Sequence, residues 1–120
     1  MTAPEGDRDC IFCRIARGEL APPFVAETAR ALAFRDLQPQ APIHILVVPR
    51  AHLSALRDLG TADPSLAAEL LNLTVEVARK ENLLDGGYRV ITNDGPDAGQ
   101  TVPHLHFHVL GGQPLRAPLG

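Results

Sequence analysis

Three of the five histidines in this chain of 120 residues fall within five consecutive positions, in the run His-Leu-His-Phe-His-Val-Leu that begins at His104. Because side chains on a β-strand alternate between its two faces, a strand here would place His104, His106 and His108 on one face and the apolar side chains on the other. A helix would scatter the imidazoles around its axis. The run therefore predicts a half-buried strand that presents a row of imidazoles, which can bind a metal, shuttle protons or attack phosphorus.

Proline and glycine divide the rest of the chain into short segments. The expected elements, in chain order, are a helix over residues 10–17 capped by Asp9, a hairpin of strands over 24–28 and 31–36, a central strand over 44–49, a short helical piece near 53–59, a helix from Pro64 to about Leu84, and a strand over 88–93. Asp63 can cap the long helix, and Pro64 suits its first position because an N–H there would have no partner.

Four apolar residues recur at helical spacing in the long helix and predict a face packed against a sheet: Leu66, Leu70, Leu73 and Val77. The apolar stripe widens at Leu71 and Leu84, which would also suit a dimer contact. Strands outnumber helices and cluster around one long helix. The expected fold class is therefore α+β, with a mainly antiparallel sheet of about five strands, one long and one short helix, and the helices on one face.

Composition favours one globular domain over residues 1–120, because apolar residues make up 45% of the chain and charged residues 21%. Residues 1–9 are expected to be a flexible N-terminus and residues 113–120 a tail. A net charge of −3 argues against nonspecific nucleic-acid binding. The sequence has neither a signal-peptide pattern nor an apolar run of about 20 residues, so we expect a cytoplasmic protein without a membrane partner.

A neutral imidazole is a competent nucleophile near neutral pH, and its attack on phosphorus splits one difficult substitution into two. His106, at the centre of the row, would need a fixed proton on its other ring nitrogen. The main chain of His104 could hold that proton in place by accepting a hydrogen bond from it. The loop from Gly99 to Thr101 could approach a phosphate with its amides and the Thr101 hydroxyl, and Asn93 offers another uncharged donor. The sequence contains no P-loop.

Cys10 and Cys13 are the two cysteines, in C-x-x-C spacing. They are too close in sequence for a disulfide that closes a long loop, so metal binding or redox chemistry is favoured. A plainer alternative is a pair of buried small side chains.

Taken together, these motifs closely resemble the histidine triad (HIT) superfamily, and within it the Hint branch. The resemblance extends from about Ile11 to the C-terminus. It rests on the histidine row, the preceding Gly-Gln-Thr-Val, the following Gly-Gly, the segment 34–42 and the strand over 44–49. It implies a homodimer with a continuous sheet and a purine nucleoside 5'-phosphoramidate hydrolase that works through a nucleotidyl-histidine intermediate.

The resemblance also implies roles for single residues. His106 would be the nucleophile, His108 and His44 would contact the phosphate, and His104 would support the row. Asp36 would bind the ribose hydroxyls. The phosphate and leaving-group site would be lined by Asn93, Gly99, Gln100 and Thr101, and the base slot by Ile11, Phe12, Ile15, Phe34 and Leu37; for these five apolar residues the alternative is plain core.

Some bacterial proteins that this chain resembles bind structural zinc through four residues that match Cys10, Cys13, His52 and His104 here. Such a Cys2His2 set is a standard tetrahedral zinc site. Animal Hint proteins generally lack the cysteine pair. If zinc is bound, His104 is a ligand and not an acid or base, and the chemical step itself needs no metal.

Three other interpretations remain open at the level of sequence. One is a hydrolase or phosphorylase of dinucleoside polyphosphates, and another is a nucleotide-binding regulatory or scaffold protein whose catalysis is incidental. The third is a histidine row that serves as a metal site alone.

Overall fold

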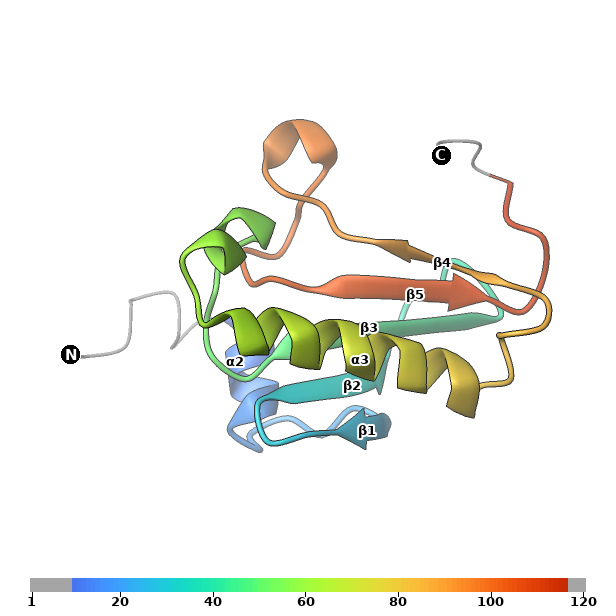
Figure 1. Cartoon of the computed structure of the whole chain (residues 1–120), viewed down its shortest axis with the longest axis horizontal. Helices are drawn as coiled ribbons and strands as arrows, with labels where there is room; N and C mark the ends of the chain where they lie inside the picture. Colours follow the sequence, from blue (N-terminus) through green and yellow to red (C-terminus); the bar gives the residue numbers. More distant parts are fainter. Residues whose placement is uncertain (1–9, 117–120) are drawn as a thin grey trace.

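The computed structural model describes residues 10–116, so the expected flexible segment 1–9 and the last four residues of the expected tail lie outside the described residues. The first helix was expected to be capped by Asp9, but its N-cap is Cys10, whose Sγ accepts from the Cys13 amide at 3.4 Å. Five strands form one antiparallel sheet in the order β1-β2-β3-β5-β4 (Figure 1). They are β1 (Phe24–Glu27), β2 (Ala31–Arg35), β3 (Ile43–Pro49), β4 (Tyr88–Ile91) and β5 (Phe107–Gly111). The α+β class, the first hairpin and the central strand are confirmed.

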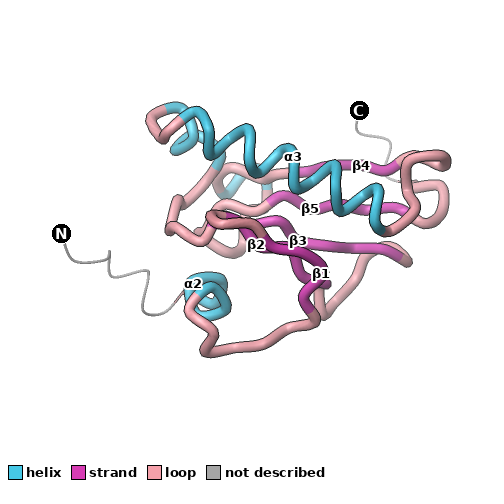
Figure 2. The backbone as a smooth tube through the Cα atoms, turned by 60° about the horizontal axis from the view of Figure 1, so that its bottom comes forward, coloured by secondary structure: helices cyan, strands magenta, loops and turns pink. Residues whose placement is uncertain are grey.

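The two faces of the sheet are covered by different helices. Helix α3 (Pro64–Lys80) crosses one face, and the short α2 (Ile11–Ala16) lies on the other (Figure 2). The sequence-based expectation of helices on one face is therefore wrong. The α3 side buries the larger apolar cluster, and the α2 side buries Phe12 and Ile15 against β2 and β3. Two separate apolar layers thus hold the central strands from both sides.

Helix α3 begins as predicted and ends earlier than predicted. Asp63 caps it by accepting a hydrogen bond from the Ser65 amide at 3.0 Å, and Pro64 follows. The helix was expected to reach Leu84, but Asn82 adopts a positive φ of 61°. The Leu83 amide then donates back to the Ala78 carbonyl at 2.9 Å, which closes a Schellman motif and stops the helix at Lys80.

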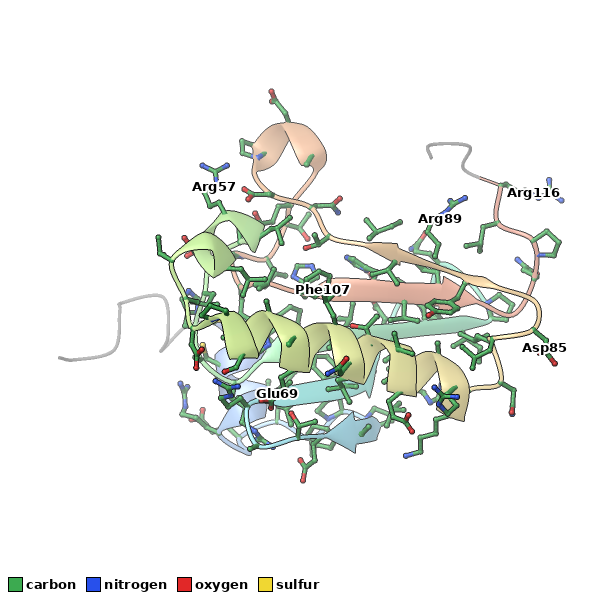
Figure 3. The ribbon with its side chains drawn as sticks, in the orientation of Figure 1. Arg57, Glu69, Asp85, Arg89, Phe107 and Arg116 are labelled. Carbon is green, nitrogen blue, oxygen red and sulfur yellow. The ribbon has the colours of Figure 1, made fainter. Side chains whose placement is uncertain are left out.

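The strand predicted over residues 104–110 begins three residues late, at Phe107. The pairing of β5 with β3 stops at Phe107 and Val47, although β3 continues to Pro49, and β4 ends at Ile91, opposite His108. Residues 104–106 therefore lie outside both ladders. The alternation of side chains nevertheless holds. Phe107 packs in the α3-side cluster with Leu105 (Figure 3). His106 and His108 lie on the α2 side.

Short helical turns connect these elements. The piece expected near residues 53–59 is a 3-10 helix, η1 (Leu56–Gly60), and a second one, η2 (Pro96–Ala98), lies in the loop after β4. Within residues 10–116, none of the helices is long and apolar enough to cross a membrane.

Candidate active site and metal centre

The ring of His106 is buried and held in one orientation. Its Nδ1 lies 2.7 Å from the main-chain oxygen of His104. A carbonyl oxygen only accepts, so Nδ1 carries the proton and Nε2 keeps its lone pair. The ring of Phe12 packs against it edge-on, with centroids 5.2 Å apart. His106 therefore presents an unprotonated Nε2, and the main-chain acceptor is the one that the sequence suggested.

His44 and His108 form a hydrogen-bonded pair beside His106. The Gln40 amide donates to His44 Nδ1 at 3.0 Å, so the proton of a neutral His44 ring lies on Nε2. That Nε2 lies 2.8 Å from His108 Nδ1, which accepts it. The remaining nitrogen of His108, Nε2, then bears a proton. The Gln40 main chain thus determines which His108 atom is a donor.

Burial keeps both of these rings neutral. For His108, burial first and then the neighbouring His106 and His44 rings lower the pKa to about 4, against an opposing effect of Asp36. Burial also lowers the pKa of His44, again opposed by Asp36. Asp36 approaches His44 Nε2 at 3.5 Å. Asp36, His44 and His108 are close enough to hold a metal, but His44 in this tautomer has no free ring nitrogen for one.

A cleft of about 430 Å³ opens in front of His106 and His108. It contains every residue predicted for the base slot and the ribose: Ile11, Phe12, Ile15, Phe34, Leu37 and Asp36. Phe12 and Phe34 meet edge to face with centroids 5.7 Å apart, which gives the slot an aromatic wall. Sequence reasoning missed Leu46, which lies on β3 directly opposite His108; the alternation along β3 could have found it.

The loop expected to bind phosphate is only partly free to do so. Thr101 lines the cleft. The Gly99 and Gln100 amides donate to the Pro96 and Gly95 carbonyls at 3.0 and 3.1 Å. The Gln100 side chain accepts from the Gly95 amide and donates to the Ser54 carbonyl, at 2.9 and 2.7 Å. Here the structure differs from the prediction, because these amides close the loop and leave Thr101 as the donor facing the cleft.

A second hollow, of about 450 Å³, lies on the other side of His108. Its lining includes His44, Asn93, Gln40 and two arginines, Arg89 and Arg116. Asn93 thus faces this hollow, apart from Thr101. Sequence reasoning missed the arginines, because their position depends on how β4 pairs with β5 and where the C-terminal segment runs.

The four predicted metal ligands come together at the end of α2. Cys10 Sγ lies 3.2 Å from His104 Nδ1, and Cys13 Sγ lies 3.2 Å from His52 Nδ1 and 3.5 Å from His104 Nδ1. All four donor atoms lie within 4.8 Å of one another. A tetrahedral zinc ion with bonds of about 2.3 Å to sulfur and about 2.0 Å to nitrogen separates such donors by about 3.5 Å. The cluster fits a metal ion of this kind.

His104 is oriented for this cluster by its second ring nitrogen. Its Nε2 lies 2.9 Å from the Pro49 carbonyl, so Nε2 carries the proton and the unprotonated Nδ1 faces both sulfurs. Second hydrogen bonds of this kind orient metal-binding histidines. His104 therefore belongs to the cysteine–histidine cluster through its ring and to the His106 site through its carbonyl.

Comparison with known proteins agrees with this geometry. A family model described as "HIT domain" matches residues 17–115. An uncharacterised HIT-like protein of Synechococcus elongatus is 44% identical over 112 residues, covering 93% of this chain and 97% of the relative. A histidine triad protein from Clostridium difficile has a TM-score of 0.86 and 43% identity, over 91% of this chain and 95% of its own. A HIT family hydrolase from Legionella pneumophila has a TM-score of 0.87 and 40% identity, over 92% and 99%.

The Legionella pneumophila structure is named a hydrolase, and a further similar structure, from Candida albicans, is named a histidine triad nucleotide-binding protein, with a TM-score of 0.76 and 32% identity over 90% of this chain and 85% of its own. Because the family model matches residues 17–115 and these relatives are at least 40% identical over more than nine tenths of the chain, apart from the Candida albicans protein, the chain belongs to the HIT-domain family.

Proposed function

We propose that this protein hydrolyses purine nucleoside 5'-phosphoramidates, releasing a nucleoside monophosphate and an amine through a nucleotidyl-His106 intermediate. The observation that carries the proposal is the 2.7 Å contact between His106 Nδ1 and the His104 carbonyl, which leaves Nε2 as a buried nucleophile facing the cleft. The same cleft offers a slot for a base and a carboxylate for a ribose.

In the first step His106 Nε2 forms a bond to phosphorus, and the bond from phosphorus to the amine nitrogen breaks. The bond pair leaves with the nitrogen, which takes a proton from water, while the exposed Thr101 hydroxyl lies in the cleft on the nucleophile's side. His106 becomes a cationic ring whose Nδ1–H points at the His104 carbonyl, so the charge forms next to an acceptor. The His108 Nε2–H donates to a non-bridging phosphate oxygen.

In the second step water attacks phosphorus and the bond to His106 Nε2 breaks. The ring takes back its electron pair and is neutral again, and the proton lost by water balances the proton taken by the amine. His108 stays neutral throughout, because its pKa of about 4 keeps Nδ1 unprotonated near neutral pH. Its Nε2–H remains the donor to the phosphate. No metal takes part in either step.

The cleft provides the binding energy for the nucleotide. A purine would stack in the apolar slot between Phe12, Phe34 and Leu37, and Asp36 would accept from the vicinal ribose hydroxyls. Asp36 already accepts from the Gln38 amide at 2.8 Å, which holds its carboxylate in place.

The test is hydrolysis of adenosine and guanosine 5'-phosphoramidates by the purified protein without added metal, with dinucleoside polyphosphates alongside. His106→Ala should abolish turnover and still bind the nucleoside monophosphate, and mass spectrometry of the wild-type protein should find one nucleotidyl group on His106. Leu56→Ala changes an exposed side chain outside the cleft and the metal-ligand cluster, and serves as the control for chemistry. Unchanged hydrolysis by His106→Ala would refute the mechanism.

We further propose that the Cys2His2 cluster holds a structural zinc ion, remote from the chemical step. The distances between its donors and the orientation of His104 support this assignment. Zinc would tie α2 to the segment that precedes β5. Unoxidised thiolate ligands suit a reducing compartment, so we also propose a cytoplasmic location. Elemental analysis should find one zinc per chain; a pure sample without zinc, whose cysteines form a disulfide, would refute the site.

Two copies of the chain are proposed to pair through β4 and α3. Strand β4 is an edge of the sheet, and Val90 on it is exposed. Leu71, Val75 and Leu84 are also exposed, which agrees with the wider apolar stripe seen in the sequence. Light scattering should show a dimer, and Val90→Lys should shift it toward monomer. A stable monomeric wild type would refute this pairing.

A further inference from the structure

We propose that this site selects substrates whose leaving group carries an anion, and that Arg89 and Arg116 bind that anion in the second hollow. The inference rests on the proposed function and assigns its substrate class. Both arginines line the hollow of about 450 Å³ that adjoins His44 and His108. Figure 3 shows Arg89 rising from β4 on the side where the C-terminal segment carries Arg116.

The register of the sheet explains why Arg89 faces the histidines. Arg89 pairs with Leu110 on β5, and Leu110 pairs with His44 on β3. Residues paired across neighbouring strands point to the same face, so Arg89 and His44 share a face two strands apart, about 10 Å between backbones. An extended arginine side chain covers most of that distance. Arg89 can therefore reach a group attached to a phosphate beside His108.

The charge of Arg89 is available for a ligand. Its side chain is partly buried, and within residues 10–116 its guanidinium group has neither an ion pair nor a hydrogen bond. Other arginines are paired with carboxylates: Arg30 with Glu69, Arg35 with Glu81 and Arg57 with Asp94. The described lining of the hollow contains no acidic residue, although the chain as a whole carries −3. This local excess of positive charge fits an anion.

The reaction geometry assigns the hollow to the leaving group. His108 lines both the cleft and the hollow, whereas His106 lines the cleft and not the hollow. In an in-line displacement the leaving group departs on the side opposite the nucleophile. With His106 on the cleft side of the phosphate, the leaving group enters the hollow. A guanidinium there would hold a carboxylate or a phosphate by two parallel hydrogen bonds.

The test compares adenosine 5'-phosphoramidates whose leaving amines are β-alanine and β-alaninamide, which differ in charge and hardly in size. A diadenosine polyphosphate forms a third arm, with phosphate as the anion. The variants are Arg89→Gln and Arg116→Gln, and Arg79→Gln on the outer face of α3 is the matched control. The readout is kcat/KM for each substrate.

The wild type and Arg79→Gln should prefer the β-alanine compound over its amide by at least about tenfold, the value of one charged hydrogen bond. Arg89→Gln should remove this preference and leave turnover of the amide unchanged, and Arg116→Gln should weaken it less because Arg116 is exposed. Faster turnover of the polyphosphate, lost in Arg89→Gln, would identify the anion as phosphate. Equal turnover of acid and amide by the wild type, or an unchanged preference in Arg89→Gln, refutes the inference while the proposed function stands. If no phosphoramidate is cleaved, both fail.

Discussion

Lowering the pH from 7 to 4 should destabilise this protein through His108. Its pKa in the folded chain is about 4, because the ring is buried and lies beside His106 and His44. In the unfolded chain the same ring has a pKa of about 6.5. At pH 7 about one folded molecule in a thousand carries the extra proton, so the His108 ring is a neutral donor where the proposed reaction runs.

The sign and size of the effect follow from proton binding. Between pH 6.5 and 4 the unfolded chain binds a proton at His108 and the folded chain does not, so the free energy of unfolding falls as the pH falls. The gap between pKa values of about 6.5 and about 4 corresponds to about 3 kcal/mol, fully present above pH 6.5 and lost by about pH 4. His44, whose pKa is also lowered, acts in the same direction.

Urea denaturation at pH 7, 6, 5 and 4 measures this loss in the wild type and in His108→Gln, which has no titrating ring. The wild type should lose up to about 3 kcal/mol more than the variant. NMR of the ring protons should show His108 unprotonated until the pH nears 4. A wild type and variant with the same pH dependence, or a His108 ring that titrates near 6.5, would refute the reasoning.

Three further predictions concern stability. Leu70 is fully buried, so Leu70→Ala should lower the free energy of unfolding by about 2–5 kcal/mol, whereas exposed Leu56→Ala should cost under about 1, both measured in urea. Asp63→Ala removes the acceptor of the Ser65 amide and should cost about 1 kcal/mol, with Asp63→Asn nearly neutral; equal losses would contradict the cap. A chelator, or Cys10→Ser, should lower the melting temperature, and identical melting curves with and without chelator would contradict a structural metal.

Much of the fold was predictable because the signals are local. The run over β3 is apolar and ends at a proline, and Asp63 with Pro64 marks the start of α3 without reference to any partner. The end of α3 was not predictable in the same way. Gly86 and Gly87 are a stronger signal for the end of a helix than Asn82. The helix nevertheless ends before Asn82, which adopts a positive φ, and the Leu83 side chain packs in the core. The position at which α3 ends therefore depends on the burial of Leu83, which is a tertiary contact.

The residues of the candidate site also fall into two groups, those with a local signal in the sequence and those without one. The histidine row and the cysteine pair were predictable because their residue types are distinctive, whereas the base slot and the grouping of His52 and His104 with the cysteines came from the resemblance to a known family. Gln40, Arg89 and Arg116 were not, because each acts through a position that only folding creates. Gln40 contributes a main-chain amide, which carries no signature in the side chain. In the sequence, Arg89 has no feature that separates it from a surface arginine. The pairing of β4 with β5 places its side chain on the face of the sheet that carries His108.

The late start of β5 is what separates the three histidines into different roles. In a regular antiparallel strand, the carbonyls of residues 104 and 106 would accept hydrogen bonds from a neighbouring strand. Because the ladder of β5 begins only at Phe107, the His104 carbonyl accepts from His106 Nδ1, and the His106 carbonyl accepts from the Thr92 hydroxyl at 2.8 Å. The His104 ring is at the same time fixed between Pro49 and the two sulfurs. A loss of metal that shifted His104 would therefore move the acceptor that determines the tautomer of His106, while His108 would keep its orientation from His44 and Gln40.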